Sequence, residues 1–445
     1  MKYVIIGGDA AGMSAAMQIV RNSSEESLEI VTLEKGEIYS YGQCGLPYVV
    51  GGTISSTEDV IARKVQTFRD KYGIDARTNH EVTLVDSNEK MVHGKHTQTG
   101  EPFSITYDKL LVASGATPAI PSWNNAELNG IFVLKTIPDT NDILDYMDET
   151  IQQVTIVGGG YIGLEMAENF KSAGKEVRII QRGNQLLGTV DADIADKIHS
   201  EAVQHGIEII YDESVHGFEG KDRVEKVYTD QHEYNTDLVL VSVGVQPNTN
   251  FLDQEVFNVG SKGELIVDEF MRTNVPDVYA AGDCACQYNR VLERNDYIPL
   301  GTHANKQGMV AGMNLVGIKK KYAGMVGTSI LKFFNLDIGK TGISVKEAES
   351  EDFPYDFVEH QATSKAGYYS KDEKLTIKMV YHSDTKKLLG AQLIGNGGVD
   401  KRLDVLATSL FHGMTTEELL DLDLAYAPPY NGVWDPIQQA AKRTL

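Results

Sequence analysis

Cys44 is the residue of this sequence that first points to chemistry. It lies in the segment SYGQCGLPY, residues 40–48, between Gln43 and Gly45. A structural cysteine is usually packed among aliphatic residues, whereas a cysteine in a polar loop bracketed by glycines can present its thiol to a ligand. We therefore predict a reactive thiol at Cys44, in front of a helix that begins near Pro47.

A reactive thiol must be ionised. At the ordinary thiol pKa of ~8.5, only about 3% of a cysteine is thiolate at pH 7. No lysine, arginine or histidine lies between residues 36 and 62. We therefore expect the free amides and dipole at the start of the helix near Pro47 to favour the thiolate.

Two segments have the β-α-β pattern of a dinucleotide-binding site. In the first, a strand at 3–6 ends in GGDAAG, and a helix over 13–22 and a strand over 28–34 follow. In the second, a strand at 154–158 leads into GGGYIG, a helix through 164–174 and a strand over 176–182. We predict one nucleotide at each loop.

The two loops differ at the positions that contact a nucleotide. Gly158, Gly160 and Gly163 have the full spacing for a tight turn, close approach of a pyrophosphate and helix packing. The first loop keeps Gly7 and Gly12 but has Asp9 at the middle position.

The residues that end the second strand of each unit also differ. Glu34 ends the strand after the first loop, where a carboxylate accepts bonds from ribose hydroxyls. Arg182 follows the other loop and favours the 2′-phosphate of NADPH, although a solvated arginine is the alternative. Use of both NADH and NADPH stays open.

The rest of the chain divides around these units. A length of 445 residues corresponds to about three domains. Apolar strands within 110–118 and 238–248 stop at Gly115 and Gly244, and VYAAGDCA, 278–285, carries Gly282 and Asp283. From about residue 326, alternating strands and a helix over 400–413 predict a separate α+β domain.

The charge of the chain excludes several partners. A formal net charge of -22 argues against nucleic acid and anionic membranes, and an anionic substrate would need a local basic pocket. The 11 histidines and 3 cysteines show no zinc spacing, so we predict no metal. The few cysteines, and a start on a strand without a leader, lead us to expect a cytoplasmic protein.

Together, GGDAAG, GGGYIG, ASGATP and AAGDCA resemble the pyridine nucleotide-disulfide oxidoreductase flavoproteins over essentially the whole chain. The resemblance implies an α/β fold with two Rossmann-like domains, for FAD and NAD(P), and a C-terminal α+β dimerisation domain. It places FAD at 1–118 and 250–325, the nicotinamide nucleotide at 119–249 and dimerisation at 326–445. It also implies a homodimer whose active sites are shared between subunits.

The same resemblance assigns cofactor contacts residue by residue. Glu34 is expected on the adenosine ribose of FAD and Asp283 on its ribitol, and an oxidised flavin beside Cys44 would add to the acidity of the thiol. Tyr161 is expected either to cover the flavin and swing away from it or simply to pack in its loop. The remaining predicted cofactor-binding residues are Gly7, Gly8, Asp9, Ala10, Ala11, Gly12, Lys35, Gly115, Gly158, Gly160, Ile162, Gly163, Arg182, Gly244 and Gly282.

Two positions distinguish branches of the family. Val49 stands where disulfide-forming members such as glutathione reductase carry a second cysteine, so Cys44 must form a sulfenic acid or a mixed disulfide with a small thiol. Ala10 stands where the NADH oxidase and peroxidase branch carries a histidine. The segments CGLPYV, AGYYS and AYAPPYNGVWDP are similar to the coenzyme A-disulfide reductase branch.

That branch implies reduction of coenzyme A disulfide by NAD(P)H through FAD and Cys44. An NADH oxidase, a peroxidase or a per/polysulfide reductase on the same scaffold is the alternative, and a signalling flavoprotein is the second alternative. Tyr368 and Tyr426 are the proton donors that the resemblance implies, acting on Cys44 of the partner subunit, with Tyr369 and Tyr430 close behind. The tyrosines could instead be packing or interface aromatics.

Ser14, Gln18 and Arg21 stand at i, i+4 and i+7 and form one polar stripe of about 10 Å on the first helix. We expect a pantetheine arm along this stripe with a phosphate near Arg21, and a solvated helix face is the alternative. Lys71 resembles a second phosphate contact of the family. Ser40, Gln43, Asn305 and Trp434 are further substrate contacts implied by position, whereas we expect Cys284 and Cys286 only to pack.

Overall fold

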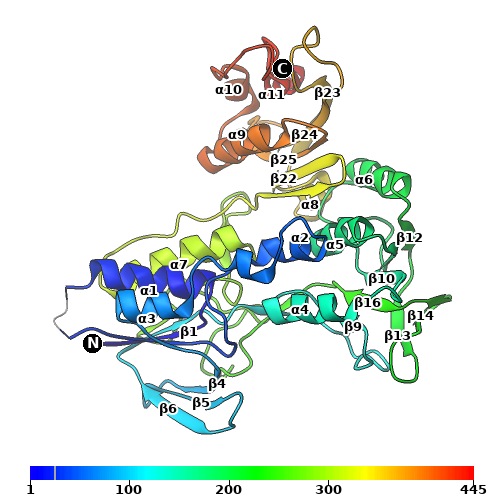
Figure 1. Ribbon diagram of the computed structural model, residues 1–445. Helices are drawn as coiled ribbons and strands as arrows, with labels where there is room; N and C mark the ends of the chain where they lie inside the picture. Colours follow the sequence, from blue (N-terminus) through cyan, green and yellow to red (C-terminus); the bar gives the residue numbers. More distant parts are fainter. Residues whose placement is uncertain (25–26) are drawn as a thin grey trace.

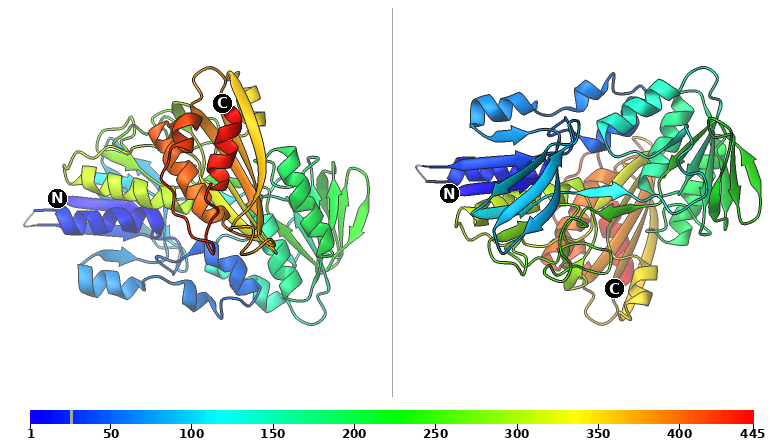
Figure 2. Two further views of the ribbon diagram at one scale, coloured as in Figure 1. Left: turned by 90° about the horizontal axis from the view of Figure 1, so that it is seen from above. Right: turned by 90° about the horizontal axis from the view of Figure 1, so that it is seen from below.

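The computed structural model describes residues 1–24 and 27–445, which form three five-stranded sheets with helices against them (Figures 1 and 2). The first sheet is parallel. Its strands are β1 (Lys2–Ile6), β2 (Glu29–Leu33), β3 (Asp75–Arg77), β7 (Lys109–Val112) and β18 (Val278–Ala280). They lie in the order β18-β7-β1-β2-β3, so a segment from the second half of the chain completes this sheet.

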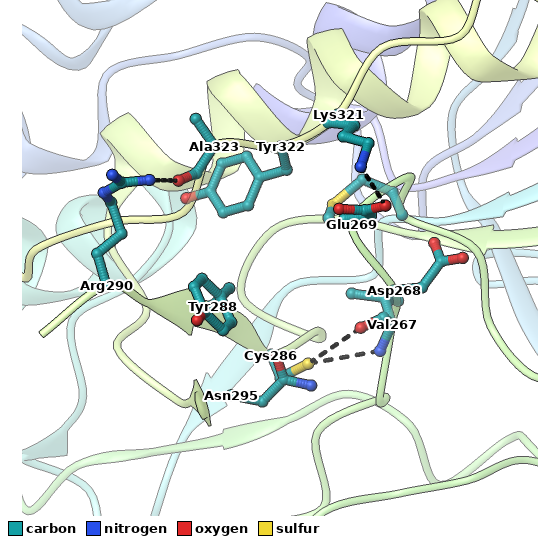
Figure 3. A pocket seen from close by; sticks show the side chains of 11 residues that line it. Val267, Asp268, Glu269, Cys286, Tyr288, Arg290, Asn295, Lys321, Tyr322 and Ala323 are labelled. Atoms are coloured by element: carbon teal, nitrogen blue, oxygen red, sulfur yellow. Dashed lines mark hydrogen bonds and ion pairs between the residues drawn. The ribbon is translucent and has the colours of Figure 1, made fainter. Parts of the chain in front are cut away.

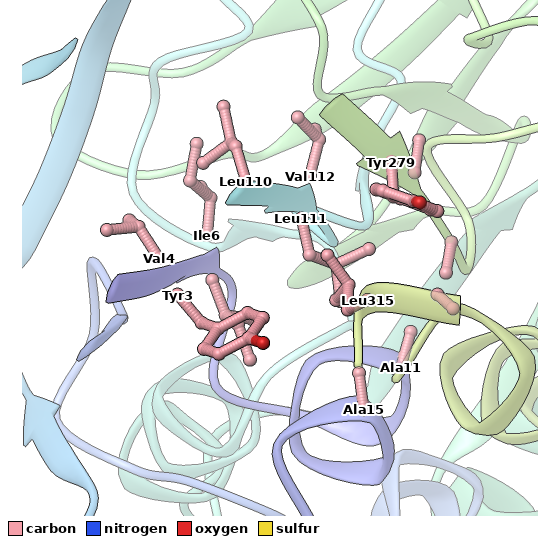
Figure 4. Close-up of a cluster of buried hydrophobic side chains, with 14 of the residues drawn as sticks. Tyr3, Val4, Ile6, Ala11, Ala15, Leu110, Leu111, Val112, Tyr279 and Leu315 are labelled. Carbon is pink, nitrogen blue, oxygen red and sulfur yellow. The ribbon is translucent and has the colours of Figure 1, made fainter. Parts of the chain in front are cut away.

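The core of this sheet explains why its strands are continuous apolar runs. Val4 lies opposite Val31 on one side and Leu110 on the other, and all three are buried. A strand with both faces covered has no polar face, so the sequence does not alternate. Helices α1 (Ala10–Asn22) and α7 (Gly301–Leu315) cover one face, and Ala11, Ala15 and Leu315 join the core there (Figure 4).

Helices α1 and α7 lie side by side and approach closely through two glycines (Figure 2). A Cβ on Gly308 would lie 2.2 Å from the backbone oxygen of Ala11, and a Cβ on Gly312 would lie 2.5 Å from that of Ala15. A larger side chain at either position must therefore push the helices apart.

The second sheet repeats this plan and is also parallel. Its strands are β9 (Ile131–Phe132), β10 (Gln153–Val157), β11 (Glu176–Gln181), β12 (Glu208–Tyr211) and β16 (Leu238–Val241). The order is β12-β11-β10-β16-β9. Its associated helices are α4 (Ile137–Tyr146), α5 (Tyr161–Ser172) and α6 (Ala192–Gln204). The two predicted dinucleotide-binding folds are thus confirmed.

The third sheet is antiparallel, as predicted for the C-terminal α+β domain. Its strands are β21 (Ser329–Phe333), β22 (Leu336–Gly342), β23 (Tyr355–Thr363), β24 (Lys374–His382) and β25 (Leu388–Gly395), in the order β21-β22-β25-β24-β23. The helices of this region are α8 (Val345–Ser350), α9 (Val399–His412), α10 (Thr416–Leu420) and α11 (Pro436–Ala441), with η3 (Lys442–Thr444) at the end. Helix α9 packs on β22 and β25.

Smaller elements connect the sheets. One three-stranded sheet contains β4 (His80–Asp86), β5 (Met91–His96) and β6 (Pro102–Thr106), and another contains β13 (Val215–Glu219), β14 (Lys226–Thr229) and β15 (Glu233–Asn235). Two hairpin-like pairs are β8 (Ala116–Pro118) with β17 (Val245–Pro247) and β19 (Gln287–Asn289) with β20 (Arg294–Asp296). The short helices are η1 (Gln43–Gly45), α2 (Leu46–Val50), η2 (Thr57–Val60) and α3 (Val65–Tyr72).

Within the described ranges, no helix combines the length and apolarity that crossing a bilayer requires.

The close contact of α1 and α7 predicts the effect of substituting Gly308. Gly308→Ala should lower the free energy of unfolding by about 1–3 kcal/mol, because the added Cβ meets backbone rather than a flexible side chain. Gly301→Ala is the matched control in the same helix, since its Cβ would meet nothing within 4 Å. Thermal unfolding of both variants measures the difference, and equal midpoints would contradict the steric explanation.

Candidate functional site

Cys44 lies in η1, at the start of the short segment that leads into α2, and is exposed to solvent. The carboxylate of Asp9, the N-cap residue of α1, holds this loop: it accepts from the Gln43 amide at 2.7 Å and from the Tyr41 backbone N–H at 3.2 Å. Burial raises the pKa of the Asp9 carboxyl, and these hydrogen bonds act in the opposite direction. Asp9, which replaces a glycine of the motif, thereby connects the thiol loop to the first nucleotide loop.

The protein groups around Cys44 oppose ionisation of its thiol. The pKa of its thiol is raised, first by desolvation and then by the charge of Glu165, while Lys135 lowers it. We expected the start of the helix and an adjacent oxidised flavin to lower this pKa together, and this stays a prediction. Helix α2 has only five residues, and two acidic side chains, Glu165 and Asp283, act on the thiol against ionisation.

Glu165 and Lys135 are functional candidates that we did not predict from the sequence. Glu165 lies in the first turns of α5, which packs against α2, and burial raises its pKa to about 7, with the charge of Glu168 adding to the effect. Lys135 precedes α4, where the capping carboxylate of Asp139 binds the Lys135 and Thr136 backbone N–H groups. Its ammonium group lies 3.0 Å from Asp283.

The first nucleotide loop fits an adenosine ribose and a pyrophosphate. Gly8 N–H and Gly36 N–H each donate to one oxygen of the Glu34 carboxylate at 2.9 Å, which fixes this carboxylate beside the loop. A Cβ on Gly7 would lie 2.1 Å from the Ala113 oxygen, and one on Gly12 would lie 2.0 Å from the Gly7 oxygen. No side chain caps the start of α1, so its first N–H groups are left for an anion.

The second loop has the same backbone geometry, but the side chain that accepts from it is an amide instead of a carboxylate. A Cβ on Gly158 or Gly163 would meet backbone oxygens at 2.5 and 2.0 Å, whereas Gly160 has open space around its Cβ position and no side chain caps α5. Gly159 N–H donates at 2.9 Å to the side-chain oxygen of Gln181, the counterpart of the Gly8 bond to Glu34. Sequence reasoning missed Gln181, and the predicted Arg182 is exposed beside it.

The other predicted cofactor residues lie around these loops. Gly115 and Gly244 have positive φ and open space at the Cβ position, and they flank the β8–β17 pair. Gly282, also at positive φ, receives support from Gln307, whose side-chain oxygen accepts its N–H. Tyr161 has its hydroxyl 2.6 Å from Ser329 Oγ, and its predicted movement stays a prediction. Ile162 and Lys35 are exposed.

Five of the eight predicted substrate residues line one cavity of about 430 Å³. These are Ser14, Gln18, Arg21, Ser40 and Asn305, and Ser14 Oγ donates to Asn305 Oδ1 at 2.8 Å. The cavity follows α1 from Ala10 to Arg21, which is about 16 Å of helix. Its end at Ala10 and Ser40 adjoins the loop that Asp9 holds.

Two further cations line this cavity. Arg63 lies over the rings of Phe68 and Tyr72 at 5.5 Å, and its backbone N–H donates to the Ser40 oxygen. Lys306 follows Asn305 on α7. With Arg21, the cavity therefore has three basic side chains in a chain of net charge -22. This is the local basic pocket that an anionic substrate needs.

Three predicted substrate residues do not line the cavity. The Gln43 amide is bonded to Asp9 instead. Lys71 is on α3, with its ammonium 5.5 Å from the Tyr72 ring, and Trp434 is a half-exposed residue of the C-terminal region. Tyr368 and Tyr426 are exposed and their hydroxyls lie 2.9 Å apart, and no hydrogen bond in the described ranges joins them to the Cys44 loop.

A larger cavity of about 620 Å³ lies elsewhere, between Val267, Cys286 and Tyr322 (Figure 3). None of the predicted site residues lines it. Its basic groups already have partners, since Lys321 pairs with Glu269 and Arg290 donates to the Ala323 oxygen. Cys284 and Cys286 are buried, and burial raises the pKa of both thiols. In the described ranges, no group of three His, Cys, Asp or Glu side chains forms a metal site.

Comparison with known proteins places this geometry in a family. An NAD(P)H sulfur oxidoreductase (CoA-dependent) of Pyrococcus abyssi is 39% identical over 99% of this chain and 97% of its own length. An NADH oxidase of Methanocaldococcus jannaschii is 32% identical over 100% of this chain and 99% of its own length. The crystal structure of reduced Bacillus anthracis CoADR-RHD has a TM-score of 0.95 at 33% identity, covering 100% of this chain and 80% of that one.

Two family matches cover most of the chain, one over the two parallel sheets and one over the antiparallel five-stranded sheet. Residues 1–308 match the pyridine nucleotide-disulphide oxidoreductase family, and residues 328–436 match its dimerisation domain. The chain belongs to the pyridine nucleotide-disulphide oxidoreductases and carries the dimerisation domain of that family.

Proposed function

We propose that this chain is an NAD(P)H-dependent flavoprotein that reduces coenzyme A disulfide to two coenzyme A thiols, with Cys44 as the redox-active thiol. The observation that carries the proposal is the cavity along α1. Arg21, Arg63 and Lys306 suit the phosphates of coenzyme A, and the end at Ser40 adjoins the thiol loop. A long anion with one sulfur end matches this shape and charge.

The two nucleotide loops suit the two cofactors. Gly7, Gly12 and Glu34 would hold the adenosine diphosphate part of FAD, and Asp283 would contact its ribitol. Gly158, Gly160 and Gln181 would hold the nicotinamide nucleotide. With FAD held there, the site would have a group able to accept a hydride from NAD(P)H and to supply two electrons to a disulfide. The corresponding domains are assigned to 1–118 with 250–325, to 119–249 and to 326–445.

Cys44 then performs the sulfur chemistry. Its thiolate attacks one sulfur of coenzyme A disulfide, the S–S bond of the substrate breaks, and a Cys44–coenzyme A mixed disulfide forms. The first coenzyme A leaves as a thiolate and takes a proton from a tyrosine hydroxyl, which solvent replaces. Two electrons from NAD(P)H and a proton then reduce the mixed disulfide, which releases the second thiol and restores the Cys44 thiolate.

The proton donor comes from the C-terminal region. Tyr368 and Tyr426 form a hydroxyl pair on an exposed surface that also carries Tyr369, Tyr430 and Trp434. Large exposed aromatics are typical of interfaces. In the proposed head-to-tail homodimer, this surface faces Cys44 of the partner subunit, and the match to the dimerisation domain supports the arrangement.

Oxidase, peroxidase and per/polysulfide reductase activities are the alternatives on this scaffold. Ala10 lies at the start of α1 and lines the cavity, so the position that carries a histidine in the oxidase and peroxidase branch supplies only a methyl group. Reduction of a per- or polysulfide would use the same thiol and cofactors. A purely signalling role would leave Cys44 without a catalytic step.

Steady-state assays with NADH and NADPH separate these activities. We expect turnover of coenzyme A disulfide to exceed that of oxygen, peroxide and polysulfide, and Cys44→Ser to lose it. The mass of the isolated protein should show one coenzyme A adduct on Cys44 that dithiothreitol removes. A peroxide rate well above the disulfide rate, or full disulfide turnover by Cys44→Ser, would refute the proposal.

Gln181 predicts dual use of the nicotinamide cofactors. Its neutral amide occupies the place that Glu34 has in the first loop, so the second site has no carboxylate to repel a 2′-phosphate. Gln181→Glu keeps an acceptor for Gly159 N–H and adds that charge. We expect the ratio of kcat/KM for NADPH over NADH to fall by about tenfold or more, which is about 1.4 kcal/mol.

Arg182→Gln is the companion variant, because Arg182 is exposed and adjacent to Gln181. It should lower kcat/KM for NADPH and leave that for NADH unchanged. A cofactor ratio that is the same in wild type and Gln181→Glu would show that Gln181 does not lie at the ribose.

Glu165 predicts the pH dependence of the thiol. Its carboxyl has a pKa of about 7 and, when ionised, raises the pKa of Cys44. Below pH 7 it is neutral, so wild type and Glu165→Gln should react alike with iodoacetamide. Above pH 7 the variant should react faster, because removal of the negative charge lowers the pKa of the thiol.

Glu168→Gln is the matched control on the same helix, since Glu168 raises the pKa of Glu165 but is not among the charges that act on Cys44. It should not accelerate alkylation. Cys284 and Cys286 are buried, so modification can be assigned to Cys44 by mass. Identical alkylation profiles for wild type and Glu165→Gln above pH 7 would contradict the prediction.

A further inference from the structure

Arg402 on α9 is a fully buried arginine in the C-terminal region, with 1% of its surface exposed. Its guanidinium group binds in several directions. It donates to the backbone oxygen of Gly398 at 2.9 Å, to that of Ser364 at 2.9 Å, to Asn431 Oδ1 at 3.2 Å and to the carboxylate of Asp435. Burying a charge with this many donors is costly unless each donor is used.

These partners lie at the bases of two loops. Ser364 begins the loop between β23 and β24, which carries Tyr368. Asn431 and Asp435 end the segment between α10 and α11, which carries Tyr426. Asn431 is also buried and donates to the Ala425 oxygen at 3.2 Å and to Asp435 at 2.7 Å, so it connects Arg402 with the residue before Tyr426.

The tips of the loops have much less support. Tyr368 is 77% exposed and Tyr426 is 47% exposed. Their hydroxyls meet at 2.9 Å, and the loops share one backbone bond, from Ala366 N–H to the Pro428 oxygen at 3.3 Å. The relative position of the two hydroxyls is therefore determined at the buried bases, where one guanidinium group binds both loops.

We infer that Arg402 is the positioning residue of the tyrosine pair: by binding the Ser364 oxygen and Asn431 together, it keeps the Tyr368 and Tyr426 hydroxyls in contact. This inference rests on the proposed function, in which the pair gives a proton to the departing coenzyme A thiolate. Arg402 touches neither substrate nor cofactor and acts only through the two loops.

The planar fork of arginine is the reason a lysine cannot substitute. Its N–H groups point in fixed, diverging directions, whereas an ammonium group is a single point with three donors. Arg402→Lys keeps the charge opposite Asp435 but cannot bind Ser364, Gly398 and Asn431 at once. The loops then lose their common support.

The experiment compares two reactions of the flavin-loaded dimer of Arg402→Lys. We expect kcat with coenzyme A disulfide to fall by about 10- to 100-fold. This loss does not exceed the rate enhancement that one positioned proton donor supplies. Reduction of ferricyanide by NAD(P)H, which needs no proton donor to a thiolate, should stay within about twofold of wild type. In the pH profile of kcat, the fall at high pH (the alkaline limb) should move to lower pH. The reason is that the hydrogen bond with Tyr426, which raises the pKa of Tyr368, is lost.

Lys340→Met is the matched control, since Lys340 is a buried cation on β22 of the same C-terminal region that pairs with Glu347 and is bonded to neither loop. It should leave both reactions and the alkaline limb unchanged. Asn431→Ala removes the Arg402–Asn431 bond together with the bond from Asn431 to the Ala425 oxygen, and leaves the Arg402 bonds to Ser364 and Asp435. It should reproduce the pattern of Arg402→Lys and serves if that variant does not fold.

A double-mutant cycle decides whether Arg402 acts through the tyrosines. In a Tyr368→Phe/Tyr426→Phe background, Arg402→Lys should cause no further loss of disulfide turnover. The inference is overturned if the loss is as large there as in wild type. It is also overturned if Arg402→Lys leaves kcat and the alkaline limb unchanged, or lowers the disulfide and ferricyanide rates together.

One readout is independent of the proposed function. The tyrosinate absorbance that disappears on Tyr368→Phe isolates the titration of Tyr368, and Arg402→Lys should move its midpoint to lower pH. If wild type does not turn over coenzyme A disulfide, the proposed function fails, while this shift still supports the positioning role. An unchanged midpoint would overturn the role whatever the substrate is.

Discussion

The hydrogen bonds that Asp9 accepts from the Cys44 loop are the constraint on which the arrangement of the site depends. Its carboxylate begins α1, is partly buried and binds both Tyr41 N–H and the Gln43 amide. The first nucleotide loop, the start of the cavity along α1 and the thiol loop are thereby joined at this carboxylate. The thiol itself is in a short helical segment whose other end, α2, is anchored by the buried residues Leu46 and Val50, so the Asp9 contact and this packing hold it from both sides.

The two nucleotide loops show how one backbone serves two ligands. Gly8 and Gly159 donate equivalent hydrogen bonds from their backbone N–H groups, the first to the carboxylate of Glu34 and the second to the amide oxygen of Gln181. The carboxylate of Glu34 is held on both oxygens, which suits a ribose with free hydroxyls. The amide of Gln181 keeps the loop geometry without its charge. The two loops therefore differ in charge at the end of the second strand while their backbone hydrogen bonds are the same.

Sequence patterns predict the repeating parts of this fold well. The strands predicted for the two β-α-β units agree with the structure within about a residue, because buried parallel strands are unbroken apolar runs, whereas the edge strands β3, β9 and β12 were not predicted. Helices α1 and α5 begin about three residues before the predicted starts, at Ala10 and Tyr161. Neither start has a side-chain cap, so the sequence lacks the signal that usually marks a helix start.

The parts of the site that sequence failed to predict come from segments far apart in the chain. Lys135, Glu165 and Arg63 have no motif, and only folding brings the first two near Cys44 and the third beside Ser40. A search of the segment around the thiol found no charge, so the sequence did not predict the acidic side chains that oppose ionisation of the thiol. The helical spacing of Ser14, Gln18 and Arg21 was informative because it is local, and all three line one cavity.

Gly308 and Gly312 connect the core with this cavity. They allow α1 and α7 to touch through their backbones, and the same two helices supply Ser14, Gln18 and Arg21 on one wall and Asn305 and Lys306 on the other. The spacing of the walls is therefore set by the interhelical distance in the core. In evolutionary terms, the shape of the cavity and the packing of the core are not independent traits in this chain. A substitution that increases the distance between α1 and α7 alters what the cavity accepts, even when every side chain that lines the cavity is kept.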